Sequence, residues 1–425
     1  MRFRRPKASE VVLGFLCLMY FITYVDRVNI ATAATSIRRE LSLSGTQLGF
    51  ILSAFGYPYI VFQIFGGWLG DRVGPRRTLF VCGLIWTAAT ILTGFVGGLT
   101  TLFFARVMLG LGEGATFPVA TRAMQAWTPP GRRGFAQGLT HAFARFGNAL
   151  TPPIVAWLIA LVTWRGSFVA LGCASLLWVV AWVWYFRDNP AEHTGITSEE
   201  LERLPHRGRA PDGGRVEIPW KRLALRMWPV TVVYFCYGWT LWMYLNWLPS
   251  YFDHEYHLQL SRSALFSAAV FSAGVGGDYL GGVISDSVLK RTGDIRRARC
   301  HFVVVAFSAS FLCVLPIFFT HDLTVVVLSL GAAFFSAELV IGPMWAIPMD
   351  IAPKYSGTAS GFMNTGSAVA AVLSPLAFGF VIDLTGNWNL PFIASMCLLL
   401  VGAVLAFTMH PEVQFEQEAA LRTAI

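Results

Sequence analysis

Long apolar runs, separated by short polar segments, occupy almost the whole chain. Most runs are about 18–25 residues long, which is the length of an α-helix that crosses a hydrocarbon core of about 30 Å. The pattern predicts an all-α membrane protein with twelve transmembrane helices, over residues 11–33, 46–70, 78–97, 100–123, 134–160, 166–186, 227–249, 262–286, 300–319, 323–349, 356–383 and 391–409.

The longest polar stretch, residues 187–226, lies between the sixth and seventh predicted helices. It is rich in proline, glycine and charged residues, which is typical of a linker, and its last part has an amphipathic pattern with Trp220 and Trp228 as interfacial anchors. The chain is therefore predicted to form an N-terminal six-helix bundle (1–186), a cytoplasmic linker with an amphipathic segment, and a C-terminal six-helix bundle (227–425).

The two predicted bundles share an internal repeat. The motif "GGWLGD" (66–71) follows the second helix, and "GGVISD" (281–286) follows the eighth. A second match aligns three residues of the fifth helix with three of the eleventh without gaps: Gly134, Gly138 and Pro152 with Gly357, Gly361 and Pro375. Such repeats relate the halves of many secondary transporters, which bind their substrate near the midplane where the halves meet.

Composition and charge agree with a membrane protein that crosses the bilayer many times. Charged residues make up 13% of the chain, against about 25% in soluble domains. Of the 32 lysines and arginines, 24 lie in the two tails or in every second loop, which places both termini in the cytoplasm by the positive-inside rule. The net charge of +8 therefore reflects orientation in the lipid bilayer and indicates no nucleic-acid partner.

Enzymatic and ATP-driven functions find no support in the sequence. It contains no Walker A motif, no HExxH and no GxSxG, the patterns of nucleotide, zinc-protease and hydrolase sites. The seven cysteines are scattered singly, without metal-ligand spacing. We therefore expect no enzyme activity, no metal and no cofactor, and a monomer that spans a cell membrane, taken to be a bacterial inner membrane.

Asp26 and Arg27 are adjacent charged residues in the middle third of the first predicted helix. A charge at the bilayer centre costs about 2.5–3.5 kcal/mol on insertion scales, so such residues face a bundle interior or an aqueous cavity. Neighbours on a helix point about 100° apart, so one can face a cavity while the other faces a neighbouring helix. Arg27 shares a partly polar stripe with Tyr20 and Thr23, which suits a cavity wall. The alternative is a neutralised pair that pins the helix to its neighbours.

A second pair of charges lies in the fourth predicted helix. Arg106 and Glu113 are seven residues apart, hence on one face and about 10 Å apart along the axis. This is too far for direct contact but close enough for each to exchange partners with Asp26 or Arg27. Burial favours the neutral form of a carboxyl, and a nearby arginine favours the charged form. A movement of the arginine would therefore make the carboxyl bind or release a proton, as a proton-coupled carrier requires.

Several motifs resemble a known family. "GGWLGDRVGPRR" resembles the loop 2–3 signature of the major facilitator superfamily, and four stretches resemble its anion:cation symporter branch, which includes bacterial hexuronate, glucarate and galactonate carriers: "YVDRVNI", "RVMLGLGEGATFP", "NWLPSYF" and "GPMWAIPMDIAPKYSGTASGFMNTG". The resemblance implies the major facilitator fold. It also implies that Arg27 and Tyr59 contact the substrate, that Asp26 and Glu113 carry protons, and that Arg106 links the two groups.

The fifth predicted helix departs from that branch. Ala144 stands where the related sugar-acid carriers have a substrate-contacting glutamine, and Arg145 follows it. His141 and Arg145 share a polar stripe with Asn148, and the repeat matches His141 with Asn364, whose counterpart in the family also contacts substrate. We expect His141, Arg145 and Asn364 to bind substrate, and a second arginine favours an anion with two charged ends. A packing histidine and a structural ion pair are the alternatives.

Charged residues near the predicted cytoplasmic helix ends are expected to form gates. In the family, the acid of the loop signature and the basic residues after it latch helix ends together; the candidates here are Asp71, Arg72, Arg76 and Asp286, with Asp350 nearby. Two further acids, Asp278 and Glu338, lie in the eighth and tenth helices. They are either additional proton sites or partners in local hydrogen bonds between helices.

Together these features predict a secondary active transporter that carries a small organic anion, a sugar acid or dicarboxylate, with protons by alternating access. An exchanger of organic anions or organophosphates is the alternative, because paired arginines suffice for exchange. Drug efflux is a weaker one, because it needs a large apolar cavity. The acids Asp26 and Glu113 favour symport.

Overall fold

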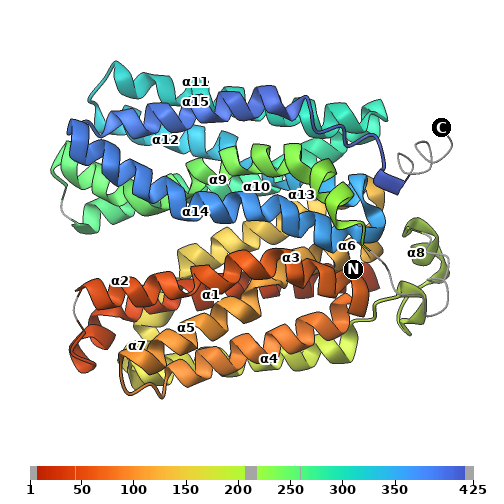
Figure 1. The fold of residues 1–425 in the computed structure, drawn as a ribbon, viewed down its shortest axis with the longest axis horizontal. Helices are drawn as coiled ribbons and strands as arrows, with labels where there is room; N and C mark the ends of the chain where they lie inside the picture. Colours follow the sequence, from red (N-terminus) through yellow and green to blue (C-terminus); the bar gives the residue numbers. More distant parts are fainter. Residues whose placement is uncertain (1–6, 44, 206–217, 259, 417–425) are drawn as a thin grey trace, which may run out of the picture. The chain divides into compact units, whose positions relative to one another are not determined.

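The structure, a computed structural model, describes residues 7–43, 45–205, 218–258 and 260–416 (Figure 1). Within these ranges the chain is helical and has no β-strand. The sequence predictions for the tails (1–6 and 417–425) and for part of the linker (206–217) lie outside the described residues.

The described residues before position 206 form eight α-helices: α1 (Ala8–Glu40), α2 (Gly45–Ala54), α3 (Gly56–Val73), α4 (Pro75–Thr93), α5 (Leu99–Gly114), α6 (Thr116–Trp127), α7 (Arg133–Tyr185) and α8 (Ser198–Arg203). The sequence explains the boundary between α3 and α4. Gly74 has a φ of 97°, which favours glycine, and Pro75 begins the next helix at a position where no N–H is needed.

The described residues after position 217 form the remaining α-helices: α9 (Trp220–Tyr256), α10 (Leu260–Thr292), α11 (Phe302–Val314), α12 (Leu323–Glu338), α13 (Ile341–Ile351), α14 (Ser356–Thr385) and α15 (Asn389–Ala406). A π-helical turn, η3 (Arg297–His301), leads into α11. The predicted amphipathic segment forms the start of α9, where Trp220 and Trp228 are exposed.

Eight helical stretches of the described residues are long and apolar enough to cross a membrane. They coincide with nine of the predicted spans, because the stretch Pro130–Tyr185 covers two of them and is interrupted at Val162 and Thr163, whose backbone angles are not helical. The other three predicted spans are occupied by α4, α9 and α10, which are not among the eight.

The chain forms two compact units that each draw on both halves of the sequence. Unit 1 comprises Met1–Pro130, Phe143–Glu217 and Lys354–Gly361; unit 2 comprises Gly131–Ala142, Ile218–Pro353 and Phe362–Ile425. The helices α7 and α14 therefore each contribute residues to both units.

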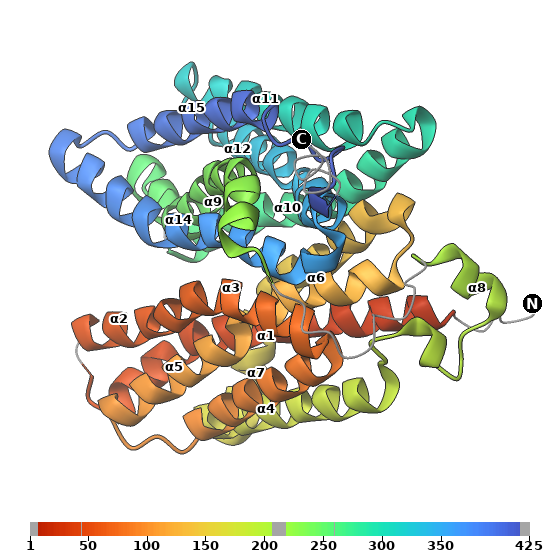
Figure 2. The same cartoon turned by 45° about the vertical axis from the view of Figure 1, so that its right-hand side comes forward.

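Within each unit the helices pack side by side. In unit 1, α5 packs against α2, α3 and α4, and these helices run alongside one another in both views (Figures 1 and 2). One core cluster of this unit joins Ile30 and Ile37 of α1 to Leu102 of α5 and Trp164 of α7. In unit 2, α12 packs against α10 and α11, and α15 packs against α9 and α11.

The first part of the linker is fastened to unit 1 by two acids. Glu200 of α8 accepts hydrogen bonds from the backbone N–H groups of Ala8 and Ser9, at 3.3 and 2.7 Å, and Asp188 accepts one from Arg76 at 2.8 Å. These donors lie in the first turns of α1 and α4, where helix geometry leaves N–H groups unpaired. The linker thus caps two helices, and α8 lies beside the start of α1 (Figure 2).

Candidate functional site

Arg27 of α1 is enclosed by an acid and four aromatic rings. Its Nε donates to Oε2 of Glu113, on α5, at 2.6 Å; the Arg27 side chain is 13% exposed and that of Glu113 is fully buried. The ring centres of four residues lie between 4.7 and 5.2 Å from its guanidinium carbon: Tyr24, Phe55, Tyr59 and Phe117. These rings attract the cation and hold it in place. Arg27, Tyr59 and Glu113 therefore form one cluster.

Asp26 has different surroundings, because adjacent helical positions point in different directions. Its Oδ2 accepts a hydrogen bond from the hydroxyl of Ser175, in the second half of α7, at 3.2 Å, and the residue is only 1% exposed. Asp26 therefore lies in the interior of unit 1, while Arg27 lies in the aromatic enclosure.

Arg106 interacts electrostatically with the acid in each of these two surroundings. It lies on α5, buried, with its guanidinium carbon 5.3 Å from the ring centre of Phe55. The charges of both Glu113 and Asp26 act on it. Unit 1 thus buries two acids and two arginines together, and the loss of any one partner would leave an uncompensated charge, which is costly in a protein interior.

Arg145 of α7 shares an aromatic partner with Arg27. Its Nη1 donates to the hydroxyl of Tyr24 at 3.3 Å, and its guanidinium carbon lies 5.9 Å from the Tyr24 ring centre. The same ring centre lies 5.1 Å from the guanidinium carbon of Arg27. The two guanidinium carbons are therefore within about 11 Å of each other, the sum of these distances. Tyr24 was not predicted as a site residue, although it is three positions before Arg27 and so on the same side of α1.

The other two predicted substrate residues belong to unit 2. His141 makes a 2.9 Å hydrogen bond through Nδ1 with the carbonyl of Gln137, and its ring centre lies 5.0 Å from that of Trp345. Trp345 in turn donates to the hydroxyl of Tyr234 at 2.7 Å. Asn364 is buried on α14. The roles of His141 and Asn364 in substrate binding remain predictions.

Asp71, the acid of the "GGWLGD" motif, caps the start of α14 within unit 1. It accepts hydrogen bonds from the backbone N–H groups of Gly357 and Thr358, at 3.1 and 2.7 Å, and pairs with Arg122 at 3.2 Å. A carboxylate is favoured at a helix N-terminus because the N–H groups there carry partial positive charge. Gly67 permits this contact, because a Cβ there would collide with the Gly357 carbonyl.

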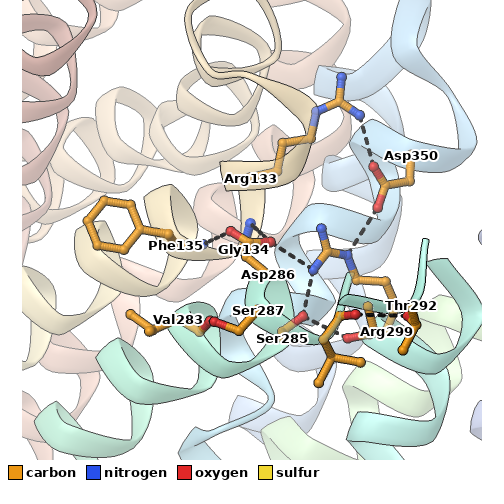
Figure 3. A network of polar contacts seen from close by, with 12 residues as sticks. Arg133, Gly134, Phe135, Val283, Ser285, Asp286, Ser287, Thr292, Arg299 and Asp350 are labelled. Carbon is orange, nitrogen blue, oxygen red and sulfur yellow. Dashed lines mark hydrogen bonds and ion pairs between the residues drawn. The ribbon is translucent and has the colours of Figure 1, made fainter. Parts of the chain in front are cut away.

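Asp286, the acid of "GGVISD", makes the equivalent contact within unit 2 (Figure 3). It accepts hydrogen bonds from the N–H groups of Gly134 and Phe135, at 3.1 and 2.6 Å, at the start of α7. Gly282, the repeat counterpart of Gly67, lies against the Gly134 carbonyl. Since the sequence repeat aligns Gly134 with Gly357, the two acids cap matching positions.

An arginine–aspartate network extends from Asp286 (Figure 3). Arg299 of η3 is fully buried and pairs with Asp286 at 3.2 Å and with Asp350 at 3.1 Å. Asp350 also accepts a hydrogen bond from Arg133 at 2.8 Å. The network therefore ties the starts of α7 and α11 to the ends of α10 and α13.

The partners of the two capping acids were not identified from the sequence. Arg72 lies over the ring of Trp68, and the Arg76 guanidinium donates to the carbonyl of Val183, so the described contacts of Asp71 are with Arg122 instead. Arg122 could have been singled out as one of four arginines inside predicted spans. The gating roles of Arg72 and Arg76 remain predictions.

Glu338 and Asp278 are both fully buried in unit 2. Glu338, at the end of α12, accepts a hydrogen bond from the hydroxyl of Tyr237, on α9, at 2.8 Å. This contact fits the alternative in which Glu338 forms a hydrogen bond between helices.

Comparisons with known proteins agree with this arrangement. The chain matches the model of the Major Facilitator Superfamily over residues 16–375. It is 47% identical over 409 residues to SauU of Cupriavidus necator, named as a probable sulfoacetate transporter, with 96% of this chain and 95% of that one covered. It is 28% identical to GarP of Escherichia coli, named as a probable galactarate/D-glucarate transporter, with 93% of both chains covered.

The fold is also that of a solved transporter. The crystal structure of the E. coli fucose:proton symporter FucP superimposes with a TM-score of 0.73 over 95% of this chain and 99% of that one, at 13% sequence identity. At that identity the likeness establishes the fold alone.

Proposed function

We propose that this chain, which belongs to the Major Facilitator Superfamily, carries a small organic dianion together with protons. That it is a membrane transporter and not an enzyme follows from its family and from relatives named as probable transporters of organic anions. The proton coupling and the two-ended substrate are the proposed part. The observation that carries the proposal is the buried ion pair between Arg27 and Glu113.

This ion pair supports coupling by exchange of partners. A substrate carboxylate that binds Arg27 displaces Glu113, and a fully buried glutamate without its arginine is strongly disfavoured in the charged form. Glu113 therefore takes up a proton when the anion binds and releases it when the anion leaves. Anion and proton then move together.

Asp26 and Arg106 are proposed to extend the coupling to a second acid. The charges of both acids act on Arg106. When one acid is protonated, Arg106 therefore interacts more strongly with the other acid. Asp26 is proposed as a second proton site, and Arg106 as the residue that links it to Glu113.

A short dianion suits the two arginines that contact Tyr24. Arg27 and Arg145 lie within about 11 Å of each other, and each can hold one anionic group by charge-assisted hydrogen bonds of about 2.7–2.9 Å. Sulfoacetate, the compound in the name of the 47% identical relative, has a carboxylate and a sulfonate. Galactarate and glucarate, in the name of another, have two carboxylates. His141 and Asn364 are proposed from the sequence as further residues that contact the substrate.

The membrane arrangement is proposed from the sequence. It comprises twelve transmembrane helices in two pseudo-symmetric bundles, 1–186 and 227–425, joined by the linker 187–226, with both termini in the cytoplasm of a bacterial inner membrane and a monomer as the working form. Alternating access then requires that, in one conformational state, the start of α14 separates from Asp71 and the start of α7 separates from Asp286. The capping acids and the arginines around them act as latches.

Uptake by vesicles tests the proposal. The purified protein, reconstituted in sealed vesicles, should accumulate sulfoacetate when a proton gradient is imposed inward, without any substrate inside. Glu113→Gln should abolish this accumulation and retain exchange between internal and external substrate. Arg291→Gln, which removes an exposed charge at the end of α10, is the control for a change in net charge.

Two other outcomes would overturn it. If wild-type uptake does not depend on the proton gradient and requires internal substrate, the protein is an exchanger. If Glu113→Gln accumulates sulfoacetate as well as the wild type does, Glu113 is a structural partner of Arg27 and carries no proton.

A further inference from the structure

Asp26 lies in a group of buried polar side chains that the exchange at Arg27 does not use. We call it the Asp26 cluster; its members come from α1, α4, α5 and the second half of α7: Asp26, Asn29, Thr87, Thr90, Arg106 and Ser175. Each is at most 4% exposed, and all belong to unit 1.

Most polar atoms of the Asp26 cluster lack a direct partner. Five of the six cluster members have buried side-chain atoms without a hydrogen bond to the part of the chain that the structure describes: Asp26 Oδ1, both polar atoms of the Asn29 side chain, the hydroxyls of Thr87 and Thr90, and Arg106 Nε. The hydroxyl of Ser175 donates a hydrogen bond to Asp26 Oδ2 at 3.2 Å.

The helices bring these atoms to one place. Asn29 follows Asp26 by one turn of α1, and Thr87 precedes Thr90 by one turn of α4. The second half of α7 approaches α4 closely here, since a Cβ on Gly172 would lie 3.3 Å from the Thr87 carbonyl oxygen. The hydroxyl of Thr90 lies close enough to the Asp26 carboxylate to act on it, although its geometry is not that of a regular hydrogen bond. A water that contacts both groups would complete the hydrogen bonding of the Thr90 hydroxyl.

Unpaired polar atoms in such a place need a small ligand. An unsatisfied buried donor or acceptor costs about 1–3 kcal/mol, and buried water, which makes about three hydrogen bonds, usually removes that cost. The cluster offers both donors and acceptors, as water requires. The charged groups that act on Asp26 are Glu113 and Arg106 of α5; α4 and α7 present hydroxyls to it, and its neighbour Arg27 pairs with Glu113.

We propose that the Asp26 cluster is a water-binding site, and that Asp26 exchanges its proton through this water. Ser175 positions the carboxylate directly, and Thr90 does so through the water. They act on the proton and not on the substrate. The part of this site in transport rests on the proposed proton coupling, but the water and the protonation of Asp26 are properties of the protein without substrate.

Infrared titration of the purified protein tests the site. The carboxylic acid band of Asp26 is assigned as the one lost in Asp26→Asn, and its pH midpoint is measured in each variant. Hydroxyl donors favour the ionised carboxylate. Ser175→Ala and Thr90→Val should therefore each raise the pH midpoint by about one unit, a tenfold change in proton affinity. Thr90→Ser should keep the wild-type midpoint.

Two matched controls remove a buried hydroxyl from the same helices. Thr93 donates to the Ala89 carbonyl at 2.8 Å and Ser167 to that of Trp164 at 2.7 Å, both within their own helices. Thr93→Val and Ser167→Ala should leave the midpoint unchanged. In the wild type, water O–H stretching bands that shift in heavy-oxygen water should change as Asp26 is protonated, and Thr90→Val should weaken them.

The outcomes separate this site from the proposed function. Unchanged midpoints in Ser175→Ala and Thr90→Val, equal shifts in the controls, or the absence of isotope-sensitive water bands would each overturn the water site. If the bands and shifts are found but vesicle uptake ignores the proton gradient, the water site stands and proton-coupled transport fails.

Discussion

At the scale of single residues, adjacent positions on α1 have different surroundings. Arg27 lies in an aromatic enclosure with Glu113, and Asp26 lies in the bundle interior with Ser175. The angular step of a helix alone separates them. The proposed anion-binding and proton-binding groups can therefore be neighbours in sequence without neutralising each other.

Arg145→Gln should reduce the preference for dianions. Arg145 shares Tyr24 with Arg27, so it can hold the second anionic group of a short substrate. A charge-assisted hydrogen bond contributes about 1.5–3 kcal/mol, so sulfoacetate affinity should fall by about 10–150-fold. A monoanion of the same length should lose much less.

Titration of sulfoacetate and a matched monoanion against both variants measures this difference. Arg291→Gln again controls for net charge. An equal loss for both ligands would mean that Arg145 supports the fold or the gate only.

The sequence predicted which residues lie on shared faces, but not all of their partners. The spacing predicted that Asp26 and Arg27 point in different directions and that Glu113 lies close enough to exchange partners with one of them. Arg122 was missed as the partner of Asp71, because helical periodicity indicates a face and not the segment that packs on it. Tyr24 was missed because an aromatic residue in an apolar run has many ordinary packing roles.

At the scale of elements, the ends of the helices carry much of the polar structure. The acids Asp71, Asp286, Asp188 and Glu200 accept hydrogen bonds from N–H groups in the first turns of α14, α7, α4 and α1. Buried N–H groups at helix starts need such acceptors. The hydrophobic pattern could not reveal two of the breaks in the predicted spans, at Phe55 and Ala115, because apolar residues continue across both.

Glu200→Ala should destabilise unit 1 by removing the cap of α1. Glu200 is buried and accepts two backbone hydrogen bonds, and leaving buried donors unsatisfied costs about 1–3 kcal/mol. The melting temperature of the purified protein should fall by several degrees.

Its neighbour provides the control for that measurement. Glu199 lies in the same turn, is exposed and pairs with Arg203, and an exposed pair contributes little. Glu199→Ala should leave the melting temperature nearly unchanged. If both variants melt alike, the linker does not stabilise α1.

At the scale of the whole molecule, the two copies of the sequence repeat make matching contacts. Asp71 and Asp286 occupy matching motif positions and cap helix starts at matching register, Gly357–Thr358 and Gly134–Phe135. The sequence alone placed these residues in register. It could not show that segments 354–361 and 131–142 each pack with the opposite half of the chain, because that is a property of the folded conformation.

Asp71→Asn and Asp286→Asn should each shift the population between conformations. The amide still accepts hydrogen bonds but loses the charge that favours a helix N-terminus and an arginine partner. Transport should slow, while the intrinsic affinity for substrate changes little.

Distance distributions between spin labels at the ends of α4 and α11 report the shift. Asp294→Asn is the control, since Asp294 is a half-buried partner of Arg297 in the same region. Distributions that stay the same in both latch variants would contradict a gating role.

Proton uptake on substrate binding tests the central claim most directly. Calorimetric titration of sulfoacetate, in two buffers of different ionisation enthalpy, gives the number of protons taken up by the purified protein for each anion bound. In the proposed exchange of partners the substrate replaces Glu113 at Arg27. The wild type should therefore take up about one proton for each bound sulfoacetate near neutral pH, and Glu113→Gln should bind the anion without this uptake. Binding that takes up no proton in the wild type, or the same number in Glu113→Gln, would contradict the exchange of partners at Arg27.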